Sequence, residues 1–351
     1  MALAKPEISV IITAYNRMWA LPRAIESCRT GNSRTEIVVV DDGSTDGTWS
    51  WLQAQEDVVA IRTDNWGKCW AANAGFAAST GEYVRFLDSD DWLLDRANDR
   101  QLVIARASKA DVIVAGHIHF EEETGRTEEI HCGSFDDFLS GYLESVSLGA
   151  DCTYTAYLMN RSFIASLRHR QEFPWDDIMF MLEVALASPN IARCDFPAVV
   201  YRQHHRDRRA SDNTGFDRVY EVWRTIAMYK KALTLVCQRN EYTHARKSII
   251  LKALWIEARK LAEWDIKEAV GLFGWILEKD RSFMPPVNQS VTRLYQTLGF
   301  GLAERVLRAR RTFLRACGFT KATTVGSPLF LPEYSRAGFP VRQCATERDG
   351  G

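Results

Sequence analysis

Short apolar runs alternate with amphipathic segments over residues 7–115 of this chain. Such runs, rich in Val and Ile, are typical of buried strands in a parallel sheet. Strands are therefore expected at Ile8–Thr13, Glu36–Val40, Val58–Arg62, Tyr83–Leu87 and Asp111–Ala115. Apolar residues at helical spacing predict helices between them, at Met18–Arg29, Trp49–Gln53, Lys68–Ala78 and Arg96–Ala107. This repetition predicts an α/β fold built from right-handed strand–helix–strand units.

The pattern changes after residue 116. A hairpin, a strand, a helix and a last strand are expected there, at His117–Phe120 with Arg126–His131, Thr153–Met159, Asp177–Ala187 and Ile191–Arg202. Pro197 favours an edge position for the last strand, because proline cannot donate to a strand ladder. A polar loop at 202–213 precedes four segments of helical periodicity, Phe216–Arg239, Thr243–Trp264, Lys267–Lys279 and Gln289–Arg315. The sequence thus predicts a mixed, mainly parallel sheet flanked by helices, followed by a helical C-terminal extension.

Composition narrows the class of protein. The chain has 351 residues, of which 46% are hydrophobic and 25% charged, enough for a sizeable core. Its 44 basic and 45 acidic residues nearly cancel, which argues against general nucleic-acid binding. The eight cysteines show no C-x-x-C spacing, so a zinc ribbon or thioredoxin motif is excluded. Without a signal peptide or a membrane-spanning run, a cytoplasmic location is expected.

Carboxylates directly follow two of the predicted strands. Asp41 comes after Ile37–Val40, and Asp88 and Asp90 come after Phe86–Leu87. The carboxyl ends of parallel strands form the edge at which open α/β sheets bind ligands. Mg²⁺ and Mn²⁺ prefer oxygen ligands and often combine one or two carboxylates with phosphate oxygens. The positions predict a site for a metal and a nucleotide, with a solvated acidic turn as the structural alternative.

Other ligand motifs do not fit these positions. An EF-hand loop starting at Asp88 would need Gly and Glu where the chain has Leu93 and Asp99. A dinucleotide site requires G-x-G-x-x-G after the first strand, whereas 13–17 contains no glycine. A phosphate-binding P-loop is also missing.

Four motifs, in this order, resemble those of the family 2 glycosyltransferases with the GT-A fold. They are ISVIITAYNR at 8–17, VVVDDGSTDGT at 38–48, NWG at 65–67 with NAG at 73–75, and GEYVRFLDSDD at 81–91. The resemblance is strong over 7–115 and extends more weakly to about 205. It implies an inverting, non-processive enzyme and leaves the sugar open. The expected domains are a GT-A catalytic domain at 1–212, with a nucleotide-binding half at about 7–115 and an acceptor half at about 116–212, a helical module at 213–318 and a tail at 319–351.

The resemblance implies roles for the residues at the strand ends. The implied nucleotide-binding residues are Thr13, Ala14, Tyr15, Asp41, Lys68, Asp88 and Ser89, with Asp90 as a metal ligand. Thr13, Ala14 and Tyr15 would form the floor under the base, and Asp41 would accept a hydrogen bond from the base ring. Asp88 and Ser89 would lie beside the ribose and diphosphate, with Lys68 near the diphosphate.

Three neighbouring positions are interpreted differently. Capping of the turn at Gly43 is the alternative for Asp41 and the preferred role for Asp42. Asp91 is expected to orient its loop or cap the next helix. Many relatives carry Arg immediately before the residue that matches Asn73, whereas this chain has Ala72. A base- or phosphate-contacting arginine is therefore missing there.

The second half should supply a catalytic base. An inverting transfer requires a carboxylate that accepts the proton of the acceptor hydroxyl. In relatives a Glu-Asp pair before a helix has this role, and Asp176 and Asp177 stand in the matching place after Trp175. Asp177 is the preferred base and Asp176 the second choice, with helix capping as the alternative. His204, in a Tyr-Arg-x-His element, is implied as a further metal ligand or a diphosphate contact.

The predicted function is a metal-dependent transfer from a nucleotide diphosphate sugar, UDP-linked, to a hydroxyl of a glycan or lipid-linked acceptor. Mn²⁺ or Mg²⁺ is the expected cofactor, and surface polysaccharide synthesis the expected setting. A nucleotidyltransferase and a non-catalytic sugar-nucleotide-binding module stay open as alternatives. The former would need a glycine-rich loop for a triphosphate, which Tyr15-Asn16-Arg17 does not offer.

The arginine-rich segment Leu302–Arg315 allows two interpretations. A bundle helix with a solvated basic face is preferred. The alternative is peripheral contact with the anionic inner face of a membrane, as basic amphipathic helices make. Such contact would suit a lipid-linked acceptor.

Overall fold

The computed structural model describes residues 5–131, 139–142, 154–170, 176–204, 206, 216–239 and 243–316. These residues form two compact units, with the boundary between Ile250 and Leu251. The first unit contains the sheet, the first of the C-terminal helices and the start of the next, and the second contains the helical residues after 250. The domain boundaries that the sequence predicts, after residues 212 and 318, rest on changes in the sequence pattern and stay a prediction.

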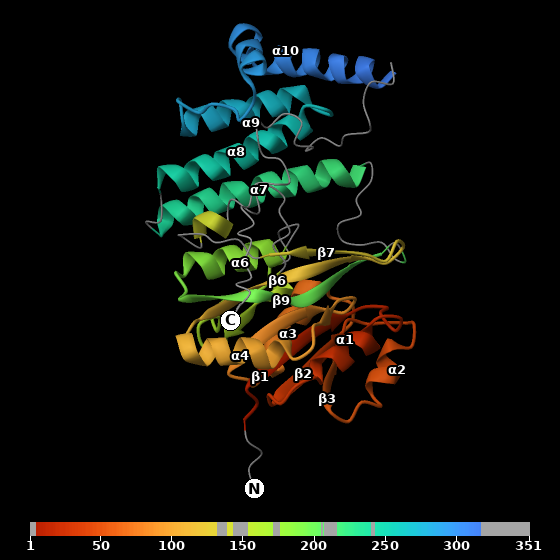
Figure 1. Cartoon of the computed structure of the whole chain (residues 1–351). Helices are drawn as coiled ribbons and strands as arrows, with labels where there is room; N and C mark the ends of the chain where they lie inside the picture. The colour runs from red at the N-terminus through yellow and green to blue at the C-terminus, as the bar shows by residue number, and fades with distance from the viewer. Residues whose placement is uncertain are drawn as a thin grey trace, which may run out of the picture. The chain divides into compact units, whose positions relative to one another are not determined.

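The first half of the first unit alternates strands and helices as predicted (Figure 1). Its elements are β1 (Ile8–Ala14), α1 (Leu21–Cys28), β2 (Thr35–Asp41), α2 (Thr48–Leu52), β3 (Val58–Arg62), α3 (Lys68–Ala78), β4 (Tyr83–Asp88), β5 (Trp92–Leu93) and α4 (Ala97–Ser108). β1 pairs in parallel with both β2 and β4, and β2 pairs in parallel with β3. The predicted parallel core of the sheet is therefore confirmed.

The second half of this unit adds antiparallel strands. Its elements are β6 (Val112–Glu121), β7 (Arg126–Ile130), a 3₁₀ turn (Tyr154–Ala156), β8 (Leu158–Asn160), α6 (Asp176–Leu186), β9 (Ile191–Gln203) and α7 (Phe216–Gln238). The described strands form one nine-stranded sheet in the order β3-β2-β1-β4-β8-β6-β9-β5, with β7 paired to β6. β8 is antiparallel to both its neighbours, whereas β9 runs parallel to β6. The predicted mixed, mainly parallel α/β fold is confirmed.

The expected edge position of the last strand is wrong. β9 lies between β6 and the short β5, which pairs with Val199 and Val200. Pro197 lies opposite Gly116, where the β6–β9 register shifts on both sides. A strand irregularity is the other setting in which a sheet tolerates proline.

The strand expected at Thr153–Met159 is also largely wrong in its described part, where only its last two residues belong to β8. Tyr154–Ala156 instead forms the 3₁₀ turn. The carbonyl of Thr155 accepts a hydrogen bond from Arg85 at 2.9 Å, and that of Ala156 accepts one from Gln101 at 3.0 Å. Side chains thus satisfy the backbone groups that a strand would present to a neighbour.

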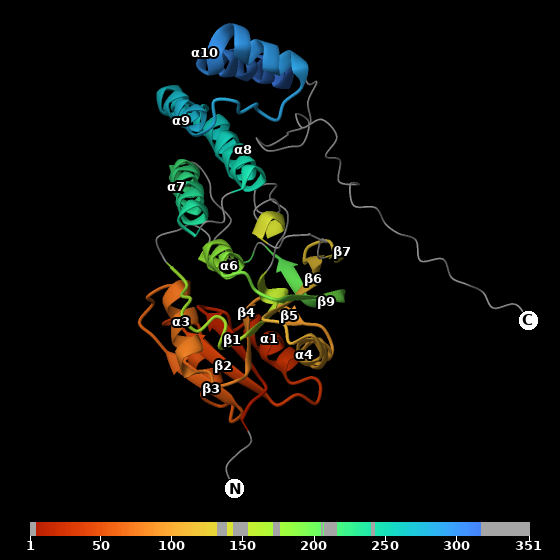
Figure 2. The same cartoon turned by 90° about the vertical axis from the view of Figure 1, so that its left-hand side faces the viewer.

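Helices cover both faces of the parallel core. Figure 2 shows α3 on one side of β1 and β2, and α1 and α4 on the other. A Cβ at Gly75 of α3 would lie 2.4 Å from Ile11 Cγ2, and one at Gly81 would lie 2.5 Å from the Ser9 nitrogen. These two glycines of the sequence motifs therefore allow close packing against β1.

The predicted C-terminal helices are confirmed. After α7 they are α8 (His244–Leu261), α9 (Ile266–Lys279) and α10 (Gln289–Ala316), the last with a kink at Gly299. In the second unit Phe273 of α9 stacks on Phe300 of α10, with ring centroids 4.6 Å apart. Within the described part of the chain, no helix is long and apolar enough to cross a membrane.

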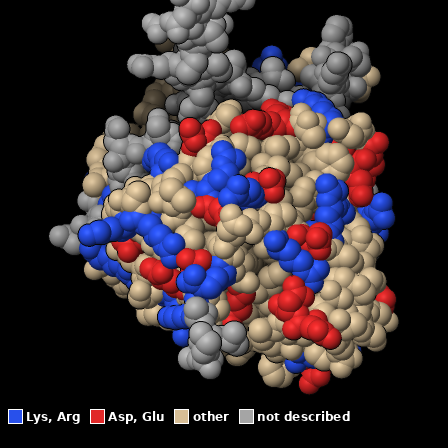
Figure 3. Space-filling model, turned by 60° about the horizontal axis from the view of Figure 1, so that its bottom comes forward, with Lys and Arg blue, Asp and Glu red and all other residues tan. Residues whose placement is uncertain are grey.

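Charges of both signs mix on the face shown in Figure 3. Basic and acidic side chains alternate there without a large patch of one sign. This distribution agrees with the net charge of −1.

Candidate active site

The carboxyl ends of β1, β2 and β4 meet at one edge of the sheet. In the strand register Ala14 lies opposite Asp41, and Thr13 lies opposite Asp88. The structure thus brings together four of the predicted nucleotide-binding residues. Tyr15, directly after β1, is 43% exposed and extends the edge toward solvent.

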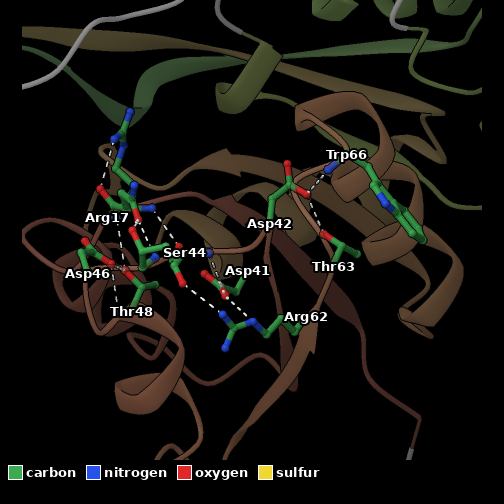
Figure 4. Close-up of polar contacts among 11 residues, drawn as sticks. Arg17, Asp41, Asp42, Ser44, Asp46, Thr48, Arg62, Thr63 and Trp66 are labelled. Carbon is green, nitrogen blue, oxygen red and sulfur yellow. Dashed lines mark hydrogen bonds and ion pairs between the residues drawn. The ribbon is translucent and has the colours of Figure 1, made fainter.

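Asp41 is fully buried at the end of β2. Its Oδ2 accepts a hydrogen bond from the Ser44 amide at 3.3 Å and lies 3.6 Å from Arg62 Nε (Figure 4). Its Oδ1 has no hydrogen-bond partner among the described residues. Because an unsatisfied buried carboxylate oxygen is costly, a donor from a bound molecule would stabilise this arrangement.

Asp42 holds the loop that leads into α3, rather than capping the turn at Gly43. Its carboxylate accepts hydrogen bonds from Thr63 Oγ1 at 2.7 Å, from the Trp66 amide at 2.8 Å and from the Gly67 amide at 2.7 Å (Figure 4). Only 4% of Asp42 is exposed. The contacts fix the backbone immediately before Lys68, so Asp42 positions that lysine.

Lys68 is the first residue of α3, and its Nζ lies 2.8 Å from Asp88 Oδ1. Both side chains are partly exposed, at 40% and 28%. Ser89, directly after the strand, is buried. The pair places a cation and a carboxylate at the carboxyl edge of the sheet, and the diphosphate contact expected of both residues stays a prediction.

Asp90 contacts His204, although 114 residues separate them. His204 Nε2 lies 3.0 Å from Asp90 Oδ2, and the imidazole is fully buried. The Arg206 amide donates to Nδ1 at 3.3 Å. This network assigns the proton of a neutral ring to Nε2, which then donates to Asp90.

Trp19 packs under this pair. Its ring meets the His204 ring edge-on, with centroids 4.6 Å apart. The guanidinium groups of Arg202 and Arg206 lie over Trp19 at 5.3 Å and 5.2 Å. The sequence predicts Trp19 on the apolar face of a helix, because it stands at helical spacing with the residues that follow it. Its contact with His204 could not be predicted, because the two residues are far apart in the chain.

Asp91 has the supporting position expected for it. Its Oδ1 accepts a hydrogen bond from the Arg202 amide at 2.9 Å, and the residue is buried. Its own amide donates to the Asp88 carbonyl at 3.1 Å. Asp91 therefore joins the turn after β4 to the end of β9, which carries His204.

The side chains at this edge could hold a divalent cation only together with ligand atoms from a bound substrate. Among the residues that the structure describes, no three His, Cys, Asp or Glu side chains are grouped to hold a metal. Asp90 and His204 supply one carboxylate and one imidazole, a set that suits Mn²⁺. Because Mg²⁺ and Mn²⁺ sites commonly include substrate phosphates, two protein ligands are compatible with such a site. Binding through Nε2 would move its proton to Nδ1 and remove the Arg206 contact.

The loop between β1 and α1 is stabilised by Asp46, which lies in the loop between β2 and α2. Asp46 accepts hydrogen bonds from Thr48 Oγ1 at 2.5 Å and from the Met18 amide at 3.1 Å (Figure 4). Partial burial acts to raise the pKa of Asp46, but these hydrogen bonds outweigh it and lower the pKa. Asp46 therefore stays charged at neutral pH and orders the loop that follows Tyr15.

The predicted base residues lie at the start of α6. Asp177 Oδ1 accepts a hydrogen bond from the amide of the next residue, Ile178, at 3.0 Å. Asp176 is the first residue of α6, and Trp175 lies outside the described residues, as do His205, Arg208 and Arg209. The contacts that join the strand-end residues in the described structure do not include Asp177, so its role stays a prediction.

Asn73 connects α3 to the segment that precedes α6. Its side-chain amide donates to the His169 carbonyl at 2.9 Å, and its side-chain oxygen accepts from the His169 amide at 3.0 Å. The His169 ring stacks on Phe180 of α6 with centroids 4.4 Å apart. Sequence reasoning treated Asn73 only as part of a motif, because its partner is 96 residues away.

Comparisons with known proteins show what this chain is similar to. Residues 9–168 match the family described as "Glycosyl transferase family 2". An uncharacterized glycosyltransferase of Nostoc sp. is 42% identical over 118 residues, which are 32% of this chain and 36% of that protein. A GalNAc(5)-diNAcBac-PP-undecaprenol beta-1,3-glucosyltransferase of Campylobacter jejuni is 34% identical over 131 residues, which are 35% of this chain and 42% of that protein. The chain thus matches well under half the length of these two relatives.

The fold is also that of a solved structure. TarS 1-349 of S. aureus superposes with a TM-score of 0.61 at 15% identity, covering 86% of this chain and 91% of that one. The same protein in complex with UDP-GlcNAc superposes with a TM-score of 0.53 at 14% identity, covering 86% and 92%. At this identity the likeness shows a shared fold.

Proposed function

We propose that this chain, which belongs to glycosyl transferase family 2 through its residues 9–168, transfers a sugar from a UDP-sugar to a hydroxyl of a glycan or lipid-linked acceptor, with inversion. The observation that carries the proposal is the strand-end cluster, whose carboxylates and Lys68 lie within residues 9–168 and whose His204 lies beyond them. There Lys68 pairs with Asp88, and Asp90 pairs with His204, beside the buried Asp41.

The nucleotide would lie along the ends of β1, β2 and β4. Asp41 Oδ1 would accept the ring N–H of the base, which supplies the donor that this buried oxygen lacks among the described residues. Thr13, Ala14 and Tyr15 would form the surface under the base. The TarS structure that contains UDP-GlcNAc supports uridine as the nucleoside.

The diphosphate would lie beside Lys68, Asp88 and Ser89. The Lys68 ammonium would neutralise part of its charge and exchange its Asp88 partner for a phosphate oxygen. Asp90, with His204, would hold Mn²⁺ or Mg²⁺. A bound divalent ion would stabilise the charge that develops on the leaving diphosphate.

The transfer itself requires one proton acceptor. The acceptor hydroxyl oxygen would attack the anomeric carbon while its proton passes to the Asp177 carboxylate, with Asp176 as the second candidate. The bond between the anomeric carbon and the diphosphate oxygen breaks, and the nucleoside diphosphate leaves with the electron pair. Because attack and departure occur on opposite faces of the carbon, the configuration inverts.

The acceptor class rests on the relatives. The Campylobacter protein is named for a lipid-linked oligosaccharide acceptor, and its 131 matched residues are 34% identical to this chain. We propose a glycan or lipid-linked glycan acceptor in surface polysaccharide synthesis for this chain as well.

The test compares Asp90→Asn and Asp177→Asn with Asp95→Asn, an exposed residue shortly after the motif. Asp90→Asn should abolish the Mn²⁺-dependent part of UDP binding, measured by calorimetry. Asp177→Asn should leave UDP binding within about twofold and lower transfer at least a hundredfold, the lower end of the usual range for a general base. Asp95→Asn should match the parent in both assays.

Three outcomes would contradict the proposal. EDTA-resistant transfer would remove the metal role, and full transfer by Asp177→Asn would remove that residue as the base. UDP-sugar binding without transfer to any acceptor in a broad glycan and lipid-linked panel would favour a non-catalytic binding module.

A further inference from the structure

The C-terminal half of α10 has one face that anchors it within the second unit. Ala303 and Leu307 are buried, with exposed fractions of 0% and 5%. Glu304, between them, lies 2.8 Å from Arg259 of α8.

A second apolar stripe lies on the exposed side of the same helix, which is drawn in blue in Figures 1 and 2. Its members follow one another at spacings of four, three and four residues, so they share one helical face. They are Leu302, Val306, Ala309 and Phe313. Leu302, Val306 and Phe313 are 51%, 43% and 67% exposed. A contiguous exposed apolar stripe on a helix that is already packed marks an interaction surface.

Arginines border the stripe on both sides. Arg305 precedes Ala309 by one turn, and Arg310 follows Val306 by one turn, on opposite edges of the stripe. Both are exposed, and neither forms an ion pair with a described residue. Arg311 differs, because it turns inward to Glu263 at 3.7 Å.

The positive charge of this surface is local. Residues 302–316 contain five arginines and a single acidic residue, the buried Glu304, whereas the whole chain has a net charge of −1. The exposed surface of this stretch therefore carries arginines without a neighbouring carboxylate on the same helix. This part of α10 combines three exposed large apolar side chains with arginines that form no ion pair with a described residue.

We propose that this surface, the α10 stripe defined by Leu302, Val306, Ala309 and Phe313 with Arg305 and Arg310, docks on an anionic lipid bilayer. The apolar side chains enter the boundary between head groups and acyl chains, and the arginines bind lipid phosphates at the same depth. A second copy of the chain fits less well, because face-to-face pairing would bring Arg305 and Arg310 against like charges. The docking does not depend on the proposed transfer reaction.

The experiment sediments the full chain with vesicles of two compositions. One is pure phosphatidylcholine, and the other contains about a third phosphatidylglycerol, enough for a strong negative surface potential. The parent protein should bind the anionic vesicles and release from them as salt rises, because surface attraction is screened within the Debye length. Neutral vesicles should bind it far more weakly.

Matched variants separate the two parts of the stripe. Arg305→Gln/Arg310→Gln should weaken binding to anionic vesicles about thirtyfold, at roughly fivefold for each arginine. Phe313→Ser should weaken it at least tenfold through lost apolar burial. The controls are Arg281→Gln/Arg293→Gln, two exposed arginines outside the stripe, and Met284→Ser, an exposed apolar residue in the loop before α10. The controls should bind as the parent does.

Every other result overturns the proposal. Failure of the parent to bind, equal binding to both vesicle types, or stripe variants that bind like the controls would each do so. A concentration-dependent dimer that Phe313→Ser dissolves would show that a second copy covers the stripe instead. Since all substituted side chains are exposed, far-ultraviolet circular dichroism should confirm that every variant remains folded.

Discussion

Removal of the Asp42 carboxylate should loosen the loop that leads into α3. Asp42→Ala deletes the acceptor of three hydrogen bonds, from Thr63 Oγ1 and from the amides of Trp66 and Gly67. Hydrogen bonds to a charged group contribute roughly 1.5–3 kcal/mol each. Water can reach part of this loop, since Trp66 is 56% exposed, so the lower end applies. At that end the three bonds total about 4.5 kcal/mol, of which the bonds from the Trp66 and Gly67 amides account for about 3 kcal/mol.

The assay measures this loss where it arises. Hydrogen exchange of the Trp66 and Gly67 amides should accelerate about a hundredfold in Asp42→Ala, the rate equivalent of that free energy. Asp42→Asn keeps one acceptor oxygen and should show a smaller acceleration. Asp64→Asn, at an exposed position in the same loop, serves as the control and should exchange like the parent.

The loop also carries Lys68, so the same variant tests its position. Gly67, whose amide donates a hydrogen bond to Asp42, directly precedes Lys68. Asp42→Ala should therefore weaken UDP binding as well as the protection of the loop amides from hydrogen exchange. Unchanged amide exchange in Asp42→Ala would refute the assignment of Asp42 as the residue that holds the loop. Faster exchange with unchanged UDP binding would refute only the link to Lys68.

Two further predictions concern the buried face of β4 and its surroundings. Arg85 is fully buried and donates hydrogen bonds to the Thr155 carbonyl, Asn98 and Gln101. Arg85→Met would leave these acceptors unpaired and should lower the free energy of unfolding, measured in urea, by about 3–5 kcal/mol. An unchanged unfolding midpoint would contradict this. Burial raises the pKa of the Cys28 thiol to about 12, whereas Cys237 is exposed. Iodoacetamide at neutral pH should therefore label Cys237 and spare Cys28 in the native protein, with both labelled in urea, as peptide mass spectrometry can measure. Rapid native labelling of Cys28 would show that its site opens readily.

Local patterns were sufficient for the parallel core of the fold. The strand at Val58–Arg62 and the helix at Lys68–Ala78 have the predicted bounds, because apolar periodicity and the flanking turn residues are both local in the sequence. The antiparallel part was harder. Pro197 suggested an edge, yet its setting depends on a register shift opposite Gly116, which no local pattern encodes.

Some contacts in the candidate site could likewise be predicted from local patterns, and others could not. Asp41 and Asp88 could be placed together because both end parallel strands, and the sheet brings such ends to one edge. The partners of Asp42 and Trp19 could not be predicted, since their contacts join loops far apart in the chain. The pairing of Asp90 with His204 was anticipated only through the family resemblance, which assigned both to one metal.

The paired hydrogen bonds between Asn73 and His169 have a mechanical consequence. An amide side chain that both donates to the carbonyl and accepts from the N–H of one residue resembles a rung of a β-ladder, here between a helix and a loop. Lys68 begins the helix that carries Asn73 near its middle. A slide of α3 along its axis would therefore move the Lys68 ammonium and pull the His169 backbone in the same stroke. Any movement of α3 would thus reach both the Lys68 end of the candidate site and the segment that precedes α6.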